Sequence, residues 1–495
     1  MRRSFKGDDL YKSIFYEYVR QLNKEKQIME FFIEGTRSRS NKILPPKFGF
    51  MSICTKTFFD KEVDDITLVP VTLNYTRTLE NDSFMGELRG EQKVPESLSR
   101  VLKAVEVLRM NLGTMYVDFC QPISVSQYTA EMQKEKPEFD PFRKQQDRVA
   151  LNFRLAHDIV FRLQKEIRMM PTNMVASIVL LYRQGISKLE LRQKVDWLGS
   201  ILTERGAKFA NDSGLPSRQM TDIGLEHLKT YLVEKQGVLS PKIVDGDYGN
   251  YIMLYYFRNP LNQVFFNEAI ILAALHSFGL EQEWQTGVGK DDLFERSVYL
   301  SQLLKREEFV QHRITADNRE FFDLILAFMI QSRYLMLKQE DSTKVLLRTS
   351  GESQIIFIRS LIFPMIDSYY VTLVYILTFV KNKGIDTVKF AKNMQWLSEL
   401  LHKQGSIQFF ESCNQQSINN AMFTYIDFGI LQKQGMQLEL QEQYQNDESH
   451  LLDTLEKINR YRSKTQIGDI LMLNDPKKGL FRRSMISQFP FMAKL

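Results

Sequence analysis

The sequence has 495 residues, of which 43% are hydrophobic and 25% charged, and its formal net charge is +5. This composition is typical of an intracellular globular protein, and the length predicts two or more domains. The three cysteines, Cys54, Cys120 and Cys413, are scattered and odd in number, which excludes a disulfide framework and a cysteine-based zinc site. The charged start at Arg2, without an apolar stretch after it, predicts no N-terminal signal peptide.

The positive charge is concentrated at the start of the chain. Residues 1–47 contain eleven Lys or Arg and six acidic residues, an excess equal to the net charge of the whole sequence. Such a basic field attracts anionic substrates or nucleic acid. No recognisable nucleic-acid-binding module accompanies it, so we expect no nucleic-acid partner.

The first third of the chain alternates between helical and strand patterns. We expect helices at residues 11–23, 48–58 and 98–108, and strands at residues 28–33, 66–75 and 113–119. The short, bulky run 28–33 is typical of a strand in a parallel sheet. The alternation predicts an α/β fold for residues 1–130, a mixed sheet with flanking helices.

The rest of the chain has a different character. Residues 131–147 are charged, contain two prolines and have little apolar periodicity, so we expect a linker there. Residues 148–495 predict a mainly helical C-terminal domain, because apolar side chains recur at three- and four-residue spacings. The helical patterns cover residues 151–167, 189–202, 270–278, 305–310 and 321–337. No repeat of fixed period is evident.

One segment is nearly long enough to cross a membrane. Residues 360–380 contain Asp367 as their single charged residue, and about 20 apolar residues span a bilayer. Pro364 and Asp367 interrupt the segment, and the uncharged remainder is too short to cross. We therefore expect a buried helix of the C-terminal domain, with a membrane-dipping helix as the alternative.

A short polar motif, Glu34-Gly35-Thr36-Arg37-Ser38-Arg39, follows the apolar run 28–33 directly. Polar groups just past the carboxyl end of a parallel strand lie where open α/β sheets bind ligands. Gly35 permits a tight turn and close approach of a ligand to the backbone. Arg37 and Arg39 can present planar guanidinium groups to phosphate oxygens. The alternatives are a solvated basic turn and a nuclear-import patch, which the spacing of the arginines alone favours.

Three motifs, taken together, carry a resemblance to a known family. The segment Phe31-Phe32-Ile33-Glu34-Gly35-Thr36-Arg37-Ser38-Arg39-Ser40 resembles the third sequence block of the glycerol-3-phosphate and dihydroxyacetone-phosphate acyltransferases. Residues 1–5, Met-Arg-Arg-Ser-Phe, look like the end of the second block, and residues 68–75, Leu-Val-Pro-Val-Thr-Leu-Asn-Tyr, like the fourth. Three blocks in the right order are a specific signal, whereas any one of them is weak.

The resemblance implies a reaction and a set of site residues. The reaction is acyl transfer from a long-chain acyl-CoA to the free hydroxyl of dihydroxyacetone phosphate, without a metal or bound cofactor. The arginines would hold the acceptor phosphate, Glu34 would position the acceptor, Gly35 would let the backbone approach it, and Pro70 would shape a strand lining the acyl site. Without the resemblance, an ion pair within the motif and a strand edge at Pro70 are the favoured interpretations. The implied substrate-binding residues are Arg2, Arg3, Glu34, Gly35, Thr36, Arg37, Ser38, Arg39 and Pro70.

The family's first block is missing from this sequence. That block is a His and an Asp separated by four residues, placed before the second block, and its imidazole is the general base. Met1 fits the hydrophobic position before the two arginines of the second block, so we expect it to be an internal residue of a longer protein; the alternative is a pseudoenzyme. Only His312 has an aspartate, Asp317, at the required spacing, and we interpret it as a chance match on a surface helix. We expect no catalytic residue in these 495 residues, and little or no turnover.

The C-terminal tripeptide Ala493-Lys494-Leu495 is a conservative variant of the peroxisomal address Ser-Lys-Leu. With the family resemblance it predicts a peroxisomal protein on the lumenal side of the membrane, recognised by the import receptor and peripherally attached. The product, 1-acyl-dihydroxyacetone phosphate, would begin ether phospholipid (plasmalogen) synthesis, and the resemblance implies alkyl-dihydroxyacetone-phosphate synthase as a partner. Two alternatives stay open: glycerol 3-phosphate as the acceptor, and a non-catalytic phosphate-binding partner of the ether-lipid enzymes.

Overall fold

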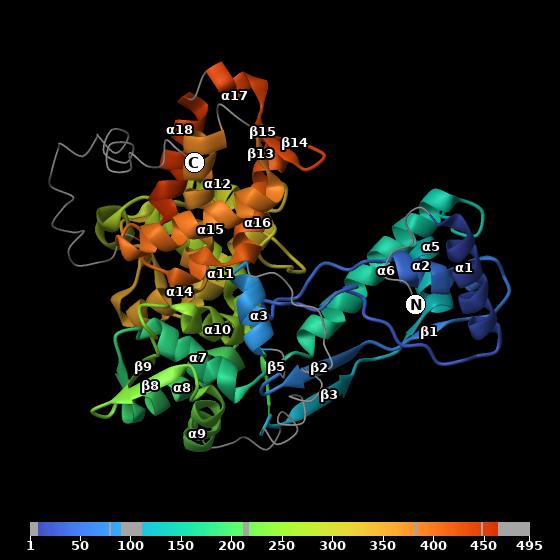
Figure 1. Cartoon of the computed structure of the whole chain (residues 1–495), viewed down its shortest axis with the longest axis horizontal. Helices are drawn as coiled ribbons and strands as arrows, with labels where there is room; N and C mark the ends of the chain where they lie inside the picture. Colours follow the sequence, from blue (N-terminus) through green and yellow to red (C-terminus); the bar gives the residue numbers. More distant parts are fainter. Residues whose placement is uncertain are drawn as a thin grey trace.

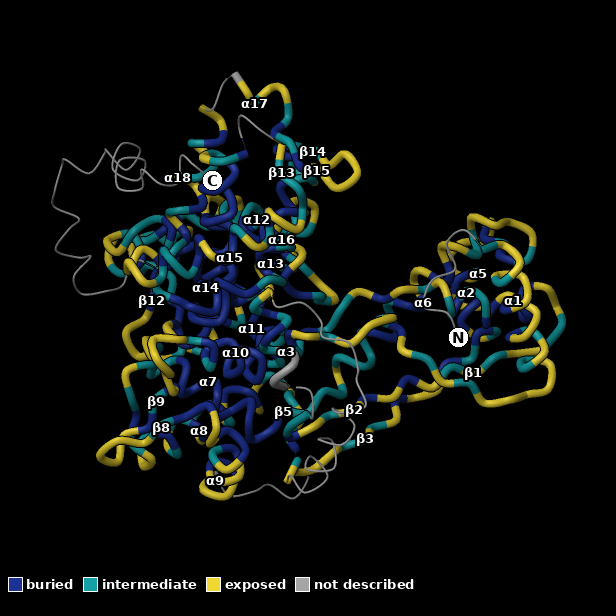
Figure 2. Tube along the Cα trace, in the orientation of Figure 1, coloured by how far each residue is buried: buried dark blue, intermediate teal, exposed yellow. Residues whose placement is uncertain are grey.

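The computed structural model describes residues 8–78, 81–90, 111–210, 217–380, 384–446 and 449–463. It has two parts (Figure 1): an N-terminal lobe, residues 8–69 and 120–165, on the right, and a larger helical body, residues 166–463, on the left. The chain is a mixed α/β protein with small sheets and a mainly helical C-terminal region, as predicted. Hydrophobic cores lie inside both parts (Figure 2).

Four helices build the N-terminal lobe. Helix α1 is capped by Asp8, whose side chain accepts a hydrogen bond of 2.9 Å from the backbone N–H of Tyr11, so the first turn has a partner for one of its free N–H groups. The first two helices confirm the predictions for residues 11–23 and 48–58. The helices are α1 (Asp9–Lys24), α2 (Gly49–Phe59), α5 (Val125–Glu135) and α6 (Gln145–Lys165).

The strand predicted at residues 28–33 is not present. These residues are extended coil that turns at Ile33. Ile28 is fully exposed, whereas Ile33 is buried. A strand needs a neighbour to exchange backbone hydrogen bonds with, and the carbonyl of Ile33 instead accepts the N–H of Lys47 at 2.8 Å. The polar motif therefore follows a coil, not the carboxyl end of a parallel strand.

The strands predicted at residues 66–75 and 113–119 are present, the first interrupted at Pro70. A proline has no N–H for a strand ladder, and the chain changes partner there: β1 pairs with β4, and β2 with β3. Both pairs are antiparallel, and neither gives the parallel pairing expected for a strand at residues 28–33. The helix predicted at residues 98–108 lies outside the described part of the chain. The strands are β1 (Thr67–Leu68), β2 (Val71–Tyr75), β3 (Met115–Phe119) and β4 (Ile123–Ser124).

One face of the β2–β3 pair is apolar and exposed. Alternate residues of a strand point to the same side, and on this side large apolar side chains stand directly opposite one another across the two strands. They are between 37% and 73% exposed, and they form what we call the β2–β3 apolar face. Its members are Val71, Leu73, Tyr75, Met115, Val117 and Phe119.

The segment predicted as a linker is packed. Residues 131–135 complete α5, and α6 begins at Gln145. Between them, Phe139 is buried in the core of the lobe, and the backbone N–H of Asp140 donates to the side chain of Asp147 at 2.8 Å. The two prolines end a helix without releasing the chain from the core. The division into domains at residues 130 and 148 stays a prediction.

The helical body contains one unit three times in succession. In each copy a short strand leads into a helix, a connection, a second helix and a β-hairpin, and the short strand pairs with the second strand of the hairpin. Winged-helix domains share this connectivity, which by itself assigns no function. The copies span residues 186–241, 288–347 and 385–440. The sequence showed no repeat of fixed period, and the three copies, which begin 102 and 97 positions apart, become visible only in the structure.

The bounds of the elements make the correspondence explicit. In all three copies, the second helix and the hairpin are joined by three residues. The first copy is β6 (Ile186–Ser187), α8 (Lys188–Thr203), α9 (Ser217–Leu228), β8 (Leu232–Lys235) and β9 (Val238–Pro241). The second is β10 (Val288–Gly289), α12 (Lys290–Leu303), α13 (Arg319–Gln331), β11 (Leu335–Lys338) and β12 (Asp341–Leu347). The third is β13 (Ile385–Asp386), α15 (Thr387–Lys403), α16 (Gln415–Asp427), β14 (Leu431–Gln434) and β15 (Gln437–Leu440).

The same positions of the first helix are buried in all three copies. Counted from the helix start, the fourth, eleventh and fifteenth positions are apolar and at most 3% exposed; in α12 the fifteenth position is the residue that follows the helix end. This spacing places them on one helix face. The equivalent sets are Leu191, Leu198 and Leu202; Leu293, Leu300 and Leu304; and Phe390, Leu397 and Leu401.

Other elements join the copies. The predicted helices at residues 189–202 and 270–278 are confirmed, whereas the one at 321–337 ends at Gln331 and is followed by β11, and residues 305–310 form a turn and coil. The remaining elements are α3 (Asn81–Leu88), β5 (Arg168–Met169), α7 (Pro171–Leu181), β7 (Lys208–Phe209), α10 (Gly249–Arg258), α11 (Asn262–His276), α14 (Glu352–Tyr375), α17 (Glu442–Asn446) and α18 (Ser449–Tyr461), with the short helix η1 (Asn259–Leu261) between α10 and α11.

Helix α14 is the apolar segment that was weighed as a membrane helix. The helical stretch Thr349–Val380 is long and apolar enough to span a bilayer, but 89% of its most apolar window is buried inside the protein. Its charged residue Asp367 is 2% exposed and pairs with Arg462 at 2.6 Å. The structure therefore favours the predicted buried helix of the C-terminal region.

Candidate functional site

The residues after Ile33 form a closed loop. The N–H of Gly35 donates to the carbonyl of Phe32 at 2.9 Å, and the loop closes where Lys47 bonds Ile33. Gly35 has φ of +63°, and a Cβ at this position would lie 2.9 Å from Cδ of Lys47. The positive φ favours glycine at this position, and the tight turn predicted at Gly35 is present. We call residues 34–42 the arginine loop.

Glu34 is the first residue of the arginine loop and is half-buried. Burial raises the pKa of its carboxyl to about 7, although the backbone N–H of Leu44 donates to it and opposes that rise. A carboxyl that titrates near neutral pH in a polar loop is a candidate functional group. Its ion pair with an arginine of its own motif, the alternative weighed from the sequence, is not what sets this pKa.

The side chains of Arg37 and Arg39 are both exposed. Arg39 forms an ion pair with Glu87 of α3, and α3 belongs to the helical body, since Leu88 is part of its core. Ser38, between the arginines, is half-buried and its Oγ has no hydrogen-bond partner. The hydroxyl and guanidinium groups of this stretch are the donors that a phosphate ligand requires.

The arginine loop continues into the helical body. The carbonyl of Ser40 accepts a hydrogen bond of 2.7 Å from Nδ2 of Asn259, in η1. Two residues later, Nζ of Lys42 lies 2.9 Å from Oε2 of Glu307 and 3.3 Å from Oε1 of Glu308. The lysine side chain is 2% exposed, and those of the glutamates are 0% and 4% exposed. We call Lys42, Glu307 and Glu308 the lysine anchor.

Polar groups of the helical body complete the lysine anchor. Asn262 donates to Glu308 at 2.9 Å, and Ser417 and Asn420 donate to Glu307 at 3.0 and 3.2 Å. Burial lowers the pKa of Lys42, but Tyr255 and the two glutamates outweigh burial and raise it. Burial also raises the pKa of Glu308, against the effect of Lys42. Buried charges persist only when paired in this way.

The remaining sequence-predicted residues lie elsewhere. Pro70 is buried between β1 and β2, where its carbonyl accepts the N–H of Cys120 at 2.9 Å. Thr36 lies in the arginine loop and is exposed. The roles assigned to these residues stay predictions. Arg2 and Arg3, and the tripeptide Ala493-Lys494-Leu495, lie outside the described residues.

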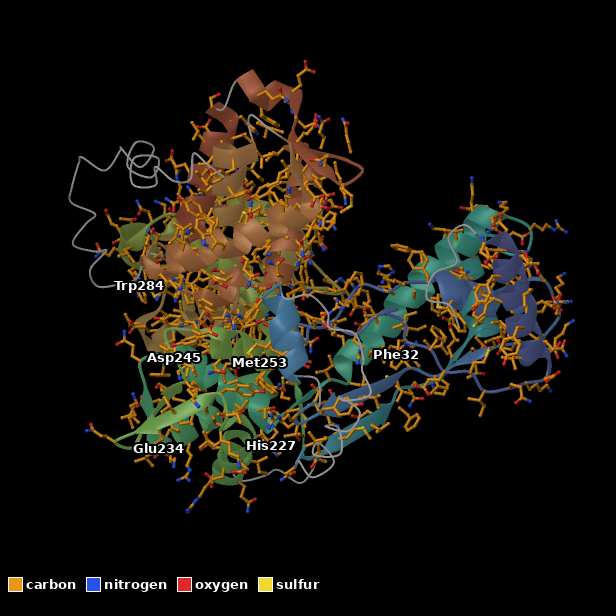
Figure 3. All side chains as sticks on the ribbon, in the orientation of Figure 1. Phe32, His227, Glu234, Asp245, Met253 and Trp284 are labelled. Carbon is orange, nitrogen blue, oxygen red and sulfur yellow. The ribbon has the colours of Figure 1, made fainter. Side chains whose placement is uncertain are left out.

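No histidine of the described chain belongs to the arginine loop. Phe32, next to the loop, lies at the end of the N-terminal lobe nearest the helical body, and His227 lies far from it (Figure 3). His312 is in a coil, not on the surface helix that was predicted. His276 bonds Oε1 of Glu283 at 3.1 Å, and Arg359 pairs with the same oxygen, so His276 is held by a buried ion pair within the helical body.

Sequence reasoning missed the residues that hold the loop in place. Lys42 was counted only as part of the basic N-terminus, and Glu307 and Glu308 were assigned only to a helical pattern at residues 305–310. Two adjacent acidic residues give no sign of burial, because such residues are usually exposed. The partners are 265 positions apart, so no local pattern joins them.

Comparison with known proteins gives two matches along the chain. Residues 84–434 match the family described as glycerol-3-phosphate acyltransferase C-terminal region, and residues 1–74 match the family described as acyltransferase. The first match covers more than half of the chain and includes the first two repeated units and the third as far as β14. The second includes the arginine loop and all of β2 except its last residue.

Individual relatives agree with these matches. The chain is 26% identical over 449 residues to the dihydroxyacetone phosphate acyltransferases of Oryctolagus cuniculus and Homo sapiens, which covers 88% of this chain and 64% of each relative. It is 29% identical over 320 residues to a glycerol-3-phosphate acyltransferase of Actinobacillus pleuropneumoniae, covering 63% of this chain and 37% of that protein. The chain thus spans less than two thirds of the length of these relatives. Together, the family matches along both parts of the chain show that it belongs to the glycerol-3-phosphate acyltransferase family.

Proposed function

We propose that this protein acts in the transfer of a long-chain acyl group from acyl-CoA to the free hydroxyl of dihydroxyacetone phosphate. The observation that carries the proposal is the arginine loop, which combines a tight turn at Gly35, a half-buried carboxyl and two exposed arginines within the acyltransferase match. Two relatives that match 88% of this chain are dihydroxyacetone phosphate acyltransferases. Their names support this acceptor.

Each loop residue has a role that its chemistry allows. Arg37 and Arg39 bind the phosphate, since guanidinium groups form paired, charge-assisted hydrogen bonds with phosphate oxygens. Ser38 adds a hydroxyl donor, and its Oγ is available for that. Gly35 lets the acceptor approach the backbone. Glu34 accepts a hydrogen bond from an acceptor hydroxyl when its carboxyl is ionised.

The reaction forms one bond and breaks one. The acceptor oxygen attacks the thioester carbonyl, a C–O ester bond forms, the C–S bond breaks, and the thiol of coenzyme A leaves with the proton that the hydroxyl gives up. A general base must take that proton first. No His and Asp separated by four residues precede the arginine loop in this sequence. Because a missing general base costs a factor of about 10² to 10⁴ in rate, we propose that residues 1–495 alone bind the acceptor but turn over little.

Glycerol 3-phosphate is the second candidate acceptor. Its phosphate would make the same contacts with the loop, and the glycerol-3-phosphate acyltransferase of Actinobacillus pleuropneumoniae supports it. A third possibility is a non-catalytic partner of lipid-synthesis enzymes, which keeps the phosphate site without the base.

The cellular setting is also a proposal. The terminal Ala493-Lys494-Leu495 supports import into peroxisomes, where the acylated product would enter ether-lipid synthesis and meet alkyl-dihydroxyacetone-phosphate synthase. Peripheral attachment to the membrane suits a donor with a long acyl chain. A fluorescent fusion with and without the last three residues tests the address: the intact tail should direct the fusion to peroxisomes, and the shortened one should leave it diffuse.

Calorimetric titration of the chain with dihydroxyacetone phosphate, glycerol 3-phosphate and glycerol tests acceptor binding. We expect both phosphates to bind and glycerol not to bind. Replacing both arginines with methionine should weaken phosphate binding by a factor of about 10 or more, because each charge-assisted bond contributes about 1.5–3 kcal/mol. The matched control is Arg143→Met, an exposed arginine of the N-terminal lobe, which should leave binding unchanged.

Acyl transfer from palmitoyl-CoA separates the enzyme from the non-catalytic partner. The chain is assayed as it stands and as a chimaera that places the first block of a relative before Met1. Activity of the chimaera alone, with dihydroxyacetone phosphate preferred, supports the proposal. If both forms are inert while the chain still binds phosphate, the protein is a non-catalytic partner. Equal binding of glycerol and the phosphates would refute the phosphate site.

A further inference from the structure

We infer that Lys42 is a positioning residue: its contact with Glu307 and Glu308 sets the place of the arginine loop, so that acceptor affinity depends on the helical body. The inference rests on the proposed function, because it assigns the loop an acceptor phosphate. It goes beyond that function by naming a residue that touches neither substrate nor reacting atoms. It also gives the C-terminal region a part in binding.

The first argument is the distance along the chain. Lys42 follows Arg39 by three positions, and three residues span at most about 10 Å. A displacement of Lys42 therefore displaces the arginines as well, because the connecting segment is short. Misplacing a binding group by about 1 Å can cost a factor of about 100 in rate, so an anchor this close to the arginines matters for binding.

The second argument is the strength of the hold. The lysine anchor is buried on all sides, and its two carboxylates receive further hydrogen bonds from Asn262, Ser417 and Asn420. These donors come from α11 and α16, which belong to different parts of the helical body. The ammonium group therefore enters a preformed acidic site, and Lys42 cannot shift without unpairing buried charge.

The third argument is that Arg39, Ser40 and Lys42, which follow one another closely in the sequence, all contact the helical body. Arg39 pairs with Glu87, the carbonyl of Ser40 accepts from Asn259, and Lys42 enters the acidic site. All three partners lie outside the N-terminal lobe, whereas the turn at Gly35 is bonded within it. The arginines thus lie between an attachment to the N-terminal lobe at Gly35 and an attachment to the helical body. Lys42 is the buried residue of the attachment to the body.

The test compares removal of one charge with removal of all. Lys42→Met leaves two buried carboxylates without their cation, and such a change strongly destabilises proteins. The triple variant Lys42→Met, Glu307→Gln, Glu308→Gln removes the cation together with both carboxylates and keeps side chains of similar size. If Lys42→Met does not fold, the triple variant carries the test alone.

The matched control is another buried ion pair. Arg205 and Glu268 lie 2.7 Å apart with side chains 6% and 8% exposed, wholly inside the helical body. The double variant Arg205→Met, Glu268→Gln removes a pair of similar burial that does not touch the arginine loop. Each protein is measured in three ways: thermal unfolding, titration with dihydroxyacetone phosphate and with inorganic phosphate, and hydrogen exchange of peptides covering residues 34–42.

A positioning role predicts a result that a general loss of stability does not. In the triple variant we expect the loop to exchange faster and acceptor affinity to fall by about tenfold or more, while exchange in α10 and α11 stays as in the wild type. The control variant should unfold at a different temperature but keep its loop exchange and its affinity. Equal affinity in the wild type and the triple variant overturns the inference.

The outcomes also separate this inference from the proposed function. If the wild-type chain binds neither phosphate compound, the proposed function fails, and the positioning role fails with it. If the wild type binds and only the triple variant loses affinity, both stand. If the control variant loses affinity to the same extent, the effect comes from weakened packing of the helical body, and Lys42 is not a positioning residue.

Discussion

The side chain of Asn259 and the backbone of Ser40 are joined by a hydrogen bond of 2.7 Å across 219 positions of the sequence. The bond ends on a carbonyl, so it fixes the course of the main chain whatever side chain residue 40 carries. Asn259 stands at the start of η1, between α10 and α11. The junction between α10 and α11 thus holds the arginine loop by its backbone.

Asn259→Ala should therefore lower the free energy of unfolding. The buried carbonyl of Ser40 loses its donor, and an unsatisfied buried polar group costs about 1–3 kcal/mol. Asn250→Ala is the matched control, because Asn250 makes the same kind of bond, at 2.7 Å to the carbonyl of Lys242, at an exposed position. We expect the control to lose less than about 0.5 kcal/mol. Urea denaturation measures both, and equal losses would contradict the role given to this bond.

Gly35→Ala should affect stability and acceptor binding together. An alanine at φ of +63° pays the left-handed penalty of about 1 kcal/mol, and its Cβ pushes against Lys47. Gly206→Ala is the control, since Gly206 has φ of +71° and nothing within 4 Å of a Cβ. Both variants should lose about 1 kcal/mol in urea denaturation, whereas only Gly35→Ala should weaken binding of dihydroxyacetone phosphate. Unchanged affinity in Gly35→Ala would separate the turn from the phosphate site.

Glu34 should make stability depend on pH. Its pKa is about 7 in the folded protein against an ordinary value of 4.5, so between these values the folded state holds more protons than the unfolded state. The free energy of unfolding then falls as pH rises through this window. The stabilising contribution of the protonated Glu34 carboxyl is complete below pH 4.5 and lost above pH 7.

Glu34→Gln keeps the neutral form at every pH, so its stability should lack this fall and exceed that of the wild type at pH 8. Urea denaturation at steps between pH 4 and pH 8 gives the comparison. Glu30→Gln, at an exposed carboxyl four positions earlier, should follow the wild-type curve. A wild-type curve that rises between pH 5 and pH 7, with Glu34→Gln parallel to it, would be inconsistent with a buried, proton-retaining carboxyl.

The β2–β3 apolar face should promote self-association of the purified chain, because contiguous exposed apolar surface favours association that removes it from water. Phe119→Ser removes its most exposed ring, 73% exposed, and should reduce concentration-dependent light scattering with little change in unfolding temperature. Phe32→Ser is the control, since Phe32 is 72% exposed but lies outside this face. Equal effects of the two substitutions would show that exposure alone, not the continuous face, drives association.

Some of this structure could be predicted from the sequence. Helices at residues 11–23, 48–58 and 189–202 follow from apolar spacing, which is a local property of the chain. The glycine turn at Gly35 follows from the need for positive φ. The family follows from three short motifs in order, and the matches along the chain confirm it.

The rest depends on contacts that the sequence does not display. Residues 28–33 have the composition of a strand, but a strand exists only where a second one pairs with it. The lysine anchor joins positions 265 apart, and its glutamates look like surface residues. The repeated units escaped notice because Leu191, Leu293 and Phe390 are 102 and 97 positions apart, and burial preserves only their apolar character.

The three repeated units give the helical body a way to diversify. In each unit the connection between the two helices contributes a buried charged residue: Arg205 bonds Glu268, Glu307 bonds Lys42, and Glu411 bonds Arg183. The helices and hairpin keep the architecture, while the connection selects what the unit holds. The connection of the middle unit therefore holds the arginine loop through Lys42, whereas the connections of the other two units hold residues of the helical body.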